Sequence, residues 1–462
     1  GAPRVRVELE PAGSTSGRVP SPSRRVDRRP VCPGAFARAF LAPNQRFPME
    51  RLLARRLARC GVSLALALLL APYGAVAAES VTLPAALELA RARSPDAEVA
   101  RQRLAEAQAE LRGARVLFVE NPEIEAVGLP TAGAPLEVEA RQALGGPGER
   151  GTRVRRAREL LAAGEADRDD AFRLLDLAVT EAWFAALAAE QRAAIAGEAA
   201  ALASDLAAIA RARVDRGADS ALVYNTARIR LAEAERARIA AEADRDAARL
   251  ELGRLLGGGP ADPADTWPTL QAAPSVESAV QTALAQRPEL AALGHQAEAE
   301  RARAREAAAD AWPELTVGAA WHREDDAERW LGVAAVTVPV FNRNQGEVGG
   351  ARAAAARLEA ELAARRALIE AEVRTLSLAR ASAERGVAVY DADVLRAQEE
   401  SVVLLRRAFE EGKVDFTELV LLQRELLEAR LGNIEARLAL WLEDARLRVS
   451  LGLPIITEGG AP

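Results

Sequence analysis

The stretch 331–346, LGVAAVTVPVFNRNQG, joins an apolar strand directly to a very long run of helix-forming residues. That run, 346–411, contains no proline, and neither does a second run at 150–215. Because proline breaks helices, each run can form one helix of roughly 100 Å at about 1.5 Å per residue. Such helices are far longer than a globular domain needs. A lipid-compatible strand joined to such a helix suggests a chain that leaves a membrane and continues as a helical tube.

One pattern occurs twice in the chain, at an offset of roughly 190–197 positions. The first copy begins with LPAALELARARSPDAEVA and runs to NPEIEAVG, and the second begins with VESAVQTALAQRPELAAL and runs to WPELTVG. Two later matches follow in the same order: VDRGADSALV with FEEGKVDFTELV, and GRLLG with RVSLG. We therefore expect two tandem helix–strand–strand–helix repeats over 79–260 and 276–455. A connector, 261–275, joins them, and a short tail, 456–462, follows.

The helices are predicted to pack through narrow seams. Apolar side chains recur at spacings of three, four and seven, which is the pattern of a helix–helix seam. These positions are Ile195, Leu202, Leu206 and Ile209; Leu395, Val402, Leu405 and Phe409; and Leu427, Leu431, Ile434, Leu438 and Trp441. Aromatic residues make up only 4% of the chain, and alanine fills many helical positions. We expect a mainly α, elongated protein with shallow packing and a small β part.

Four apolar stretches are predicted to be strands: Glu123–Leu129, Leu136–Leu144, Glu314–Trp321 and Trp330–Phe341. The second alternates strictly between apolar and charged residues, which fits lipid on one face and a wet lumen on the other. Trp321 and Trp330 flank the polar loop HREDDAE and are predicted to be membrane-interface aromatics. The smallest membrane barrels have about eight strands, so several protomers must share one barrel, and three copies would supply twelve.

The chain is expected to be exported. Residues 49–78, beginning at the only methionine, read as a signal peptide with a basic start, an apolar core and small residues at its end. The preceding segment, 1–48, reads as non-native upstream sequence or a disordered segment. Both cysteines, Cys32 and Cys60, lie before residue 79, so disulfides and thiolate metal sites are not expected beyond it.

Charge and hydropathy exclude two other classes. Residues 79–462 hold 48 basic and 63 acidic side chains, a net charge of −15, which disfavours nucleic-acid binding. No later stretch approaches about 18 uninterrupted apolar residues, so we expect no transmembrane helix. A chain of this kind must span a membrane with strands in a closed barrel.

The exported, duplicated pattern resembles the outer-membrane efflux family typified by TolC, over about residues 80–455. The segment 338–346, VPVFNRNQG, resembles the second strand-to-helix junction of the branch that serves heavy-metal pumps. Gln142 to Gly146, with Arg153 and Ala157, resembles the first. Members of that branch often carry a lipidated N-terminal cysteine, which this chain lacks.

The resemblance implies a homotrimer in the cell outer membrane, with a twelve-stranded β-barrel continuous with a long periplasmic α-helical barrel. It implies a passive exit duct of a tripartite efflux system, with heavy-metal cations as one candidate cargo. The implied partners are outer-membrane lipid, a periplasmic adaptor protein and an inner-membrane transporter of the resistance–nodulation–division class.

The two turns between the long helices are candidate contact sites. Gly217 and Gly412 can take the positive φ of such a turn, and Ser220 and Thr417 can cap the following helix. The need to close and cap a turn between two helices also accounts for these residues, without any docking role. By resemblance the turns form the periplasmic tip, where the adaptor docks. The predicted docking residues are Gly217, Ser220, Leu222, Gly412, Thr417 and Leu419.

Acidic side chains gather at the same turns. In a trimer they would converge as an entrance ring that favours cations. A solvated helix end is the simpler interpretation of the same residues. The candidate ring residues are Asp215, Asp219, Glu410, Glu411 and Asp415.

The strand-to-helix junctions are predicted to be structural. Proline stops a strand because it cannot donate to the ladder, and asparagine can cap a helix. The junction residues are Gly145, Gly146, Pro339, Phe341, Asn342, Asn344 and Gly346.

No catalytic, cofactor or metal site is predicted. His295 and His322 are isolated surface histidines in the sequence, and GGGP at 257–260 lacks the Lys-Ser/Thr of a phosphate loop. No nucleophile–base constellation appears, so we do not expect an enzyme. Two alternatives to a duct remain: an exported coiled-coil scaffold or adaptor without a pore, and a diffusion porin. Paired strands in each repeat argue against the first, and the helical content argues against the second.

Overall fold

The computed structural model describes residues 80–128, 135–264, 267–324, 327–390 and 413–453, with scattered positions from 396 to 411. The predicted upstream segment, signal peptide and tail 456–462 lie outside these residues. Within them, helices dominate and the strands gather in one place, so the prediction of a mainly α fold with a small β part is confirmed.

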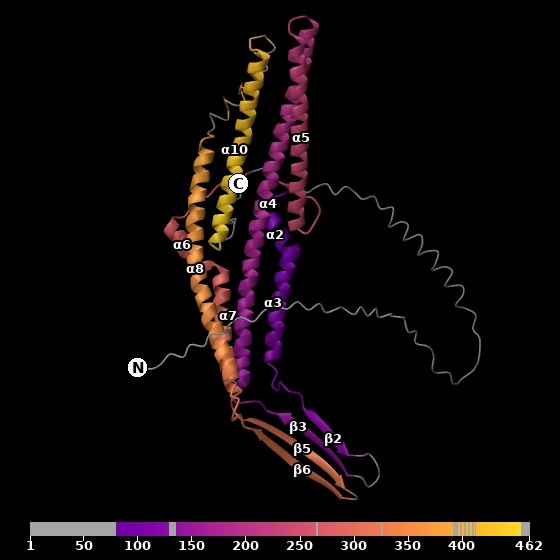
Figure 1. Ribbon diagram of the computed structural model, residues 1–462, viewed down its shortest axis with the longest axis vertical. Coiled ribbons are helices and arrows are strands. Elements are labelled where there is room, and N and C mark those ends of the chain that lie inside the picture. The colour runs from indigo at the N-terminus through magenta and orange to yellow at the C-terminus, as the bar shows by residue number, and fades with distance from the viewer. Residues whose placement is uncertain are drawn as a thin grey trace, which may run out of the picture. The chain divides into compact units, whose positions relative to one another are not determined.

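The elements follow in the same order in two halves of the chain (Figure 1). The first half comprises α2 (Leu83–Arg93), α3 (Pro95–Ala114), β2 (Glu123–Gly128), β3 (Leu136–Ala143), α4 (Glu149–Asp215) and α5 (Ala221–Leu255). The second comprises α6 (Val276–Gln286), α7 (Pro288–Ala309), β5 (Glu314–Glu324), β6 (Ala327–Thr337), α8 (Gln345–Ala388) and α10 (Phe416–Ser450). Short parallel strands β1 (Ser80–Val81) and β4 (Asp262–Pro263) pair the start of the described chain with the segment after α5.

The central helix is α4, whose 67 residues agree with the helix predicted at 150–215. It packs against α2, α3, α5, α7 and α10. By length and composition, α4 is apolar enough to cross a membrane, which we had not expected of any helix. In its most apolar stretch of 18 residues, 39% is buried inside the protein. Its neighbours on several sides explain the apolar side chains as helix–helix contacts.

The prediction of one helix over 346–411 was wrong, because α8 ends at Ala388. Gly386 and the β-branched Val387 and Val389 weaken the helix there. Tyr390 follows, and its hydroxyl lies so close to α10 that a Cβ added to Gly432 would be 2.5 Å from it. The absence of proline removed one cause of a helix end but not these others. The seam positions Leu395, Val402, Leu405 and Phe409 lie outside the described residues.

An aromatic cluster forms the largest buried core. Phe184 of α4 stacks on Trp267 and Trp441, with ring centroids 5.7 and 5.1 Å apart, and meets Trp183 edge-on at 5.2 Å. The indole Nε1 of Trp183 donates a hydrogen bond of 2.9 Å to the carbonyl of Val81, so the buried polar group is satisfied. Few aromatic residues are present, but they are concentrated where α2, α4, α5 and α10 meet.

Two glycines close the last helix of each half in the same way. Gly257 follows α5 with φ +73°, and Gly452 follows α10 with φ +71°. A Cβ at these positions would lie 2.6 Å from the carbonyl oxygen of Arg93 and 2.9 Å from that of Gln286, each at the end of the half's first helix. Both positions therefore need glycine for conformation and for space.

The four long strands form one antiparallel sheet in the order β2-β3-β5-β6. The sheet lies beyond the ends of α3, α4, α7 and α8 (Figure 1). The predicted strands are confirmed in number and in their starts at Glu123, Leu136 and Glu314, but β6 begins at Ala327 and ends at Thr337. The expected polar loop HREDDAE is mostly strand. The strand pairing continues into it, with His322 opposite Arg329 and Glu324 opposite Ala327.

Candidate functional site

The sheet has one apolar face and one largely charged face. Successive side chains of a strand point to opposite faces. The register between the strands places apolar residues beside apolar residues on one face and most of the charged residues together on the other. The apolar face carries Ile124, Ala126, Val138, Ala140, Leu315, Val317, Ala319, Trp321, Trp330, Gly332, Ala334 and Val336, with Gln142, Arg323 and Glu328 toward its two ends. The other face carries Glu123, Glu125, Glu137, Glu139, Arg141, Glu314, Thr316, His322, Glu324 and Arg329, while β6 adds Leu331, Val333 and Ala335.

Among the residues that the structure describes, nothing covers the apolar face or the sheet edges. Ile124, Leu315 and Val336 are exposed, and Trp330 is 75% exposed. In the described residues β2 and β6 each pair with a strand on one side only, so both outer edges retain free backbone groups. Exposed apolar area joined to open edges is unfavourable in water. Within the described residues, the chain itself relieves neither of these unfavourable features.

Trp321 and Trp330 are cross-strand partners, not residues flanking a loop. Both lie on the apolar face, near the turn that joins β5 to β6 and at the end of the sheet away from the helices. His322, which we expected in a loop, is a strand residue in register with Glu137 and Arg329, and its Nε2 lies 3.7 Å from Glu324. The interface role of the tryptophans stays a prediction.

At the first junction, two glycines and a glutamate turn the chain into α4. Gly145 has φ +67°, and the carboxylate of Glu149 accepts a hydrogen bond of 3.0 Å from the amide of Gly146. Glu149 also forms an ion pair of 2.9 Å with Arg153. Burial, and then the charge of Glu149, raise the pKa of the neighbouring Asp310. Sequence reasoning named the glycines but missed the carboxylates that hold them.

At the second junction, Pro339 follows the end of β6 and Gly346 lies in the first turn of α8. Asn342 accepts a hydrogen bond of 3.1 Å from the amide of Asn344, which has φ +53° and stands at the N-cap. The Asn344 side chain makes no cap hydrogen bond and instead contacts Asp310 at 3.4 Å. Phe341 is 94% exposed. The junction is thus a turn with an outward aromatic side chain.

The end of the first hairpin is held by an ion pair across its turn. Gly217 adopts φ +72°, as predicted, and Arg213 donates to Asp219 at 2.6 Å. Ser220 is the N-cap of α5, but its side chain makes no cap hydrogen bond. Asp215 is exposed, 3.9 Å from Arg211. Leu222 is 73% exposed and free to contact a partner.

The end of the second hairpin is described in part. Asp415, not Thr417, is the N-cap of α10, and it accepts a hydrogen bond of 2.8 Å from the amide of Glu418. Glu411 pairs with Lys413 at 2.5 Å. Leu419 is 1% exposed because it packs against Leu206 of α4. Glu410, Gly412 and the side chain of Thr417 lie outside the described residues.

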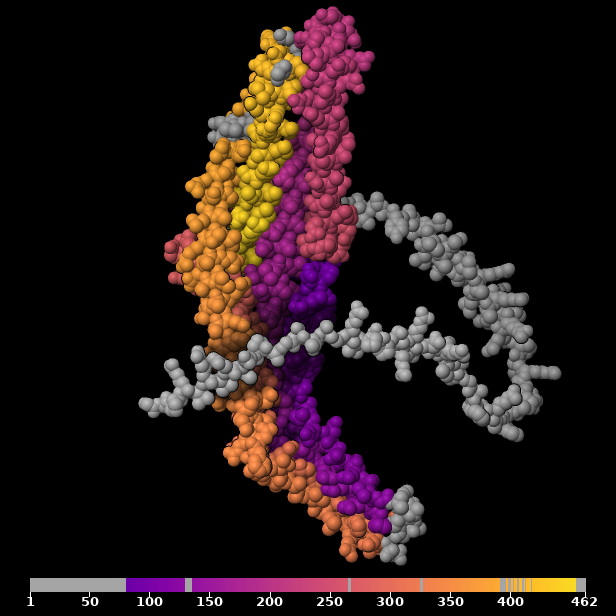
Figure 2. All heavy atoms as spheres, in the orientation of Figure 1, coloured from indigo at the N-terminus to yellow at the C-terminus, as the bar shows by residue number. Residues whose placement is uncertain are grey.

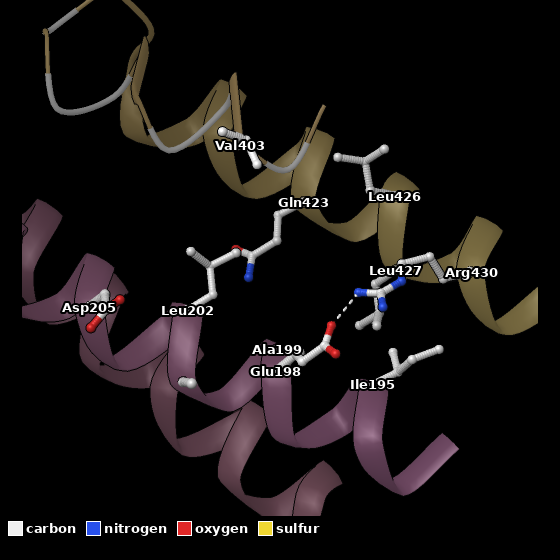
Figure 3. A pocket seen from close by; sticks show the side chains of 11 residues that line it. Ile195, Glu198, Ala199, Leu202, Asp205, Val403, Gln423, Leu426, Leu427 and Arg430 are labelled. Atoms are coloured by element: carbon white, nitrogen blue, oxygen red, sulfur yellow. Dashed lines mark hydrogen bonds and ion pairs between the residues drawn. The ribbon is translucent and has the colours of Figure 1, made fainter. Parts of the chain in front are cut away.

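The two hairpin ends lie side by side (Figure 2), and Phe416 at the start of α10 packs against α4 and α5. Farther along, α4, α10 and Val403 line an open groove of about 420 Å³ (Figure 3). Ile195 and Leu427 from the predicted seams line it, and Glu198 pairs with Arg430 at 2.7 Å beside it. The seam pattern therefore located the α4–α10 contact correctly.

Half-buried ion pairs that the sequence did not single out fix the short helices to the long ones. Arg91 pairs with Asp176, and Arg287 pairs with Glu372 at 2.8 Å. The separation along the chain is 85 residues in both cases. A search for charged pairs that recur at the same spacing in both repeats would have found them.

Metal-ligating side chains do not cluster in the part of the chain that the structure describes: no group of three or more His, Cys, Asp or Glu could hold an ion there. His295 Nδ1 contacts Glu159 at 2.9 Å, which joins α7 to α4. This pair has a structural role between two packed helices.

Comparison with known proteins agrees with this geometry. Residues 279–453 match the family model described as outer membrane efflux protein. The cobalt-zinc-cadmium resistance protein CzcC of Cupriavidus metallidurans is 29% identical over 420 residues, covering 87% of this chain and 94% of CzcC. Residues 279–453 are thus an outer membrane efflux protein domain. The resemblance inferred from the sequence is thereby confirmed.

Solved structures share the fold of this chain. A crystal structure of CusC superposes with a TM-score of 0.68 at 18% identity, covering 82% of this chain and 93% of CusC. VceC of Vibrio cholerae gives a TM-score of 0.64 at 17% identity, with 81% and 97% covered. The matched proteins are outer membrane efflux channels, and the family consists of channels, not enzymes.

Proposed function

We propose that this chain is one subunit of a trimeric, passive exit duct in a tripartite efflux system. The observation that carries the proposal is the uncovered sheet, which has an apolar face, a charged face and two open edges. Four strands cannot close, whereas three copies supply twelve, within the range of membrane barrels. The apolar face then meets lipid and the charged face lines a wet lumen.

The long helices support the periplasmic half of the proposal. At about 1.5 Å per residue, the 67 residues of α4 extend roughly 100 Å from the sheet. A tube of such helices leads from the membrane toward a periplasmic adaptor and an inner-membrane transporter. Exposed Leu222 and the turn at Gly217 are the proposed docking points, and Ser220 lies between them. Leu419 is buried here and can take part only if α10 moves from α4.

Cell fractionation and detergent extraction test the duct. The protein from the outer-membrane fraction should be a trimer with dominant helical circular dichroism. A soluble periplasmic monomer would instead support the alternative of a coiled-coil scaffold or adaptor without a pore. The free apolar sheet argues against that alternative, because a soluble adaptor has no use for it.

Heavy-metal cations are the proposed cargo, because the name of the relative CzcC states resistance to cobalt, zinc and cadmium. No dedicated metal site is required in a passive duct. Cells lacking this chain should lose tolerance to those metals and regain it when the gene is restored. Unchanged tolerance would point to another cargo.

The acidic residues at the hairpin ends are proposed to favour cations at the entrance. Asp219 and Glu411 each have a basic partner, whereas Asp215 is exposed and its arginine is 3.9 Å away. Asp215 is thus only weakly paired. Asp215→Asn should reduce the cation preference of reconstituted channels, and an unchanged reversal potential in a salt gradient would exclude the ring.

A further inference from the structure

One basic side chain lies on the apolar face of the sheet. It belongs to Arg323, which the register of β5 places opposite Leu136 of β3 and Glu328 of β6. Among the described residues of that face, Glu328 carries the only other charge. A charge on a surface assigned to lipid is unfavourable unless it reaches the polar headgroups. The position of Arg323 along its strand therefore decides what it can contact.

Arg323 lies next to the end of β5, and that end of the strand points away from the helices (Figure 1). The cross-strand partners Trp321 and Trp330 lie on the same face, and Arg323 follows Trp321 by two residues. Two residues span roughly 6.6 Å along a strand, or roughly 5 Å along the membrane normal for a strand tilted by about 40°. Tryptophans favour the membrane–water interface, so Arg323 reaches the level of lipid phosphates just beyond it.

The guanidinium of Arg323 is held against an aromatic ring. Its Cζ atom lies 5.8 Å from the centroid of the Trp321 ring, within the range of a cation–π contact. Glu328 is its cross-strand neighbour, but no ion pair joins these two described residues. A guanidinium that stacks on a ring keeps the N–H groups at its edge available to donate. Trp321 thus positions Arg323 and leaves its hydrogen-bond donors for another partner.

The arginines of the opposite face have other surroundings. Arg141 pairs with Glu125 and, at 3.2 Å, with Glu139, so carboxylates of the sheet itself balance its charge. Arg329 lies on that face as well, in register with His322. Within the described sheet, Arg323 therefore combines the apolar face, a stacked ring and available donors in a way that these two arginines do not.

We propose that Arg323 binds a phosphate group of lipid A in the outer leaflet of the outer membrane. The inference rests on the proposed duct, because it takes the apolar face as lipid-facing and the long helices as periplasmic. The end of the sheet opposite the helices then faces the outer leaflet, whose main lipid component, lipid A, carries phosphates on its sugar headgroup. A guanidinium matches this group because it can donate two parallel hydrogen bonds to one phosphate.

Glu328 gives the proposal a second, opposite effect. Its carboxylate lies on the neighbouring strand at the level of Arg323 and repels a phosphate bound there. Removing the charge of Glu328 should tighten the binding of lipid A, whereas removing that of Arg323 should weaken it. Opposite responses at two neighbouring positions distinguish phosphate recognition from general damage to this end of the sheet.

Thermal unfolding of the purified trimer measures the binding. A ligand that binds only the folded state raises the unfolding temperature. Delipidated wild-type trimer should unfold at a higher temperature with lipid A that carries two phosphates than with dephosphorylated lipid A or with phosphatidylglycerol. This comparison needs no variant. An equal rise with either of the other two lipids would overturn the proposal.

Variants of two residues identify the side chains. Arg323→Gln should weaken the affinity for lipid A about tenfold or more, the loss expected for a hydrogen bond to a charged group. Arg323→Lys retains a positive charge without the stacked, planar donor group, so its affinity should be intermediate. Glu328→Gln should raise the affinity. Wild-type affinity in Arg323→Gln would overturn the proposal.

Arg329→Gln separates failure of the lipid A site from failure of the duct. Arg329 is adjacent to Trp330 in β6 but lies on the charged face, so this variant should bind lipid A as the wild type does. If Arg329→Gln loses the response to lipid A while Arg323→Gln keeps it, the charged face meets lipid and the proposed duct is wrong. If neither variant changes the response, only the lipid A site is wrong.

Discussion

A single buried arginine joins three elements in the second half of the chain. Arg287, 3% exposed, donates to the carbonyl of Ser450 at 2.6 Å and pairs with Glu289 and Glu372 at 2.8 Å. It thereby connects the α6–α7 corner to α8 and to the end of α10. Such a group cannot be removed without leaving carboxylates and a carbonyl unpaired.

Arg287→Ala should destabilise the protein by about 3 kcal/mol, the cost of breaking a buried ion pair. Thermal unfolding in detergent measures it. Arg287→Lys keeps the charge but not the forked geometry, so it should fall between the alanine variant and the wild type. An alanine variant as stable as the wild type would show that the cluster contributes nothing.

Glu289 makes stability depend on acid pH. Burial opposes its ionisation, but hydrogen bonds from Arg365 and Arg287 outweigh this and hold its pKa below the ordinary value. A lowered carboxyl pKa stabilises the fold above the unfolded pKa of about 4.3, and this contribution is lost as the pH falls through the folded pKa. Glu289→Gln should therefore unfold at a lower temperature near pH 7, with the difference shrinking below about pH 4. A constant difference would contradict the pKa argument.

Gly257 and Gly452 should tolerate no side chain. Each Gly→Ala change combines left-handed strain with a Cβ under 3 Å from a carbonyl oxygen, so we expect a loss of about 1–3 kcal/mol in each. Gly294→Ala is the matched control, because it lies within α7 with open space around it and should gain up to about 1 kcal/mol. Equal effects at all three positions would refute the claim that the two corners require glycine.

At the scale of elements, patterns that are local in sequence predicted the structure well. The proline-free run became α4, the alternation in Leu136 to Arg141 became β3, and Gly217 took the positive φ of a hairpin turn. Each depends on neighbours within a few residues. The end of α8 was missed because the sequence reasoning looked only for proline. The ion pairs were missed because their partners lie 85 residues apart.

Strand β5 offers a direct comparison of the two sheet faces. Val317 lies on the apolar face and its neighbour Thr316 on the charged face. A lysine near the middle of a lipid-facing surface costs about 2–4 kcal/mol, whereas a lumen position tolerates charge. Val317→Lys should reduce the folded trimer recovered from outer membranes, and Thr316→Lys should not. Equal recovery would mean that the faces are assigned wrongly.

For the whole molecule, the two halves explain how one chain combines a sheet suited to a membrane with long helices suited to water. The four strands meet in one sheet because β3 and β5 pair across the repeat boundary. The long helices all adjoin the same end of that sheet. The chain alone leaves the sheet edges open. Closing the sheet therefore needs further strands, and the proposed trimer would supply them.

Single-channel recording in planar lipid bilayers tests the central claim most directly. Trimers purified from the outer membrane should insert and produce discrete, reproducible conductance steps, because three sheets close around a wet lumen. A protein that is extracted as a monomer, or a trimer that never conducts at any voltage, would contradict the account.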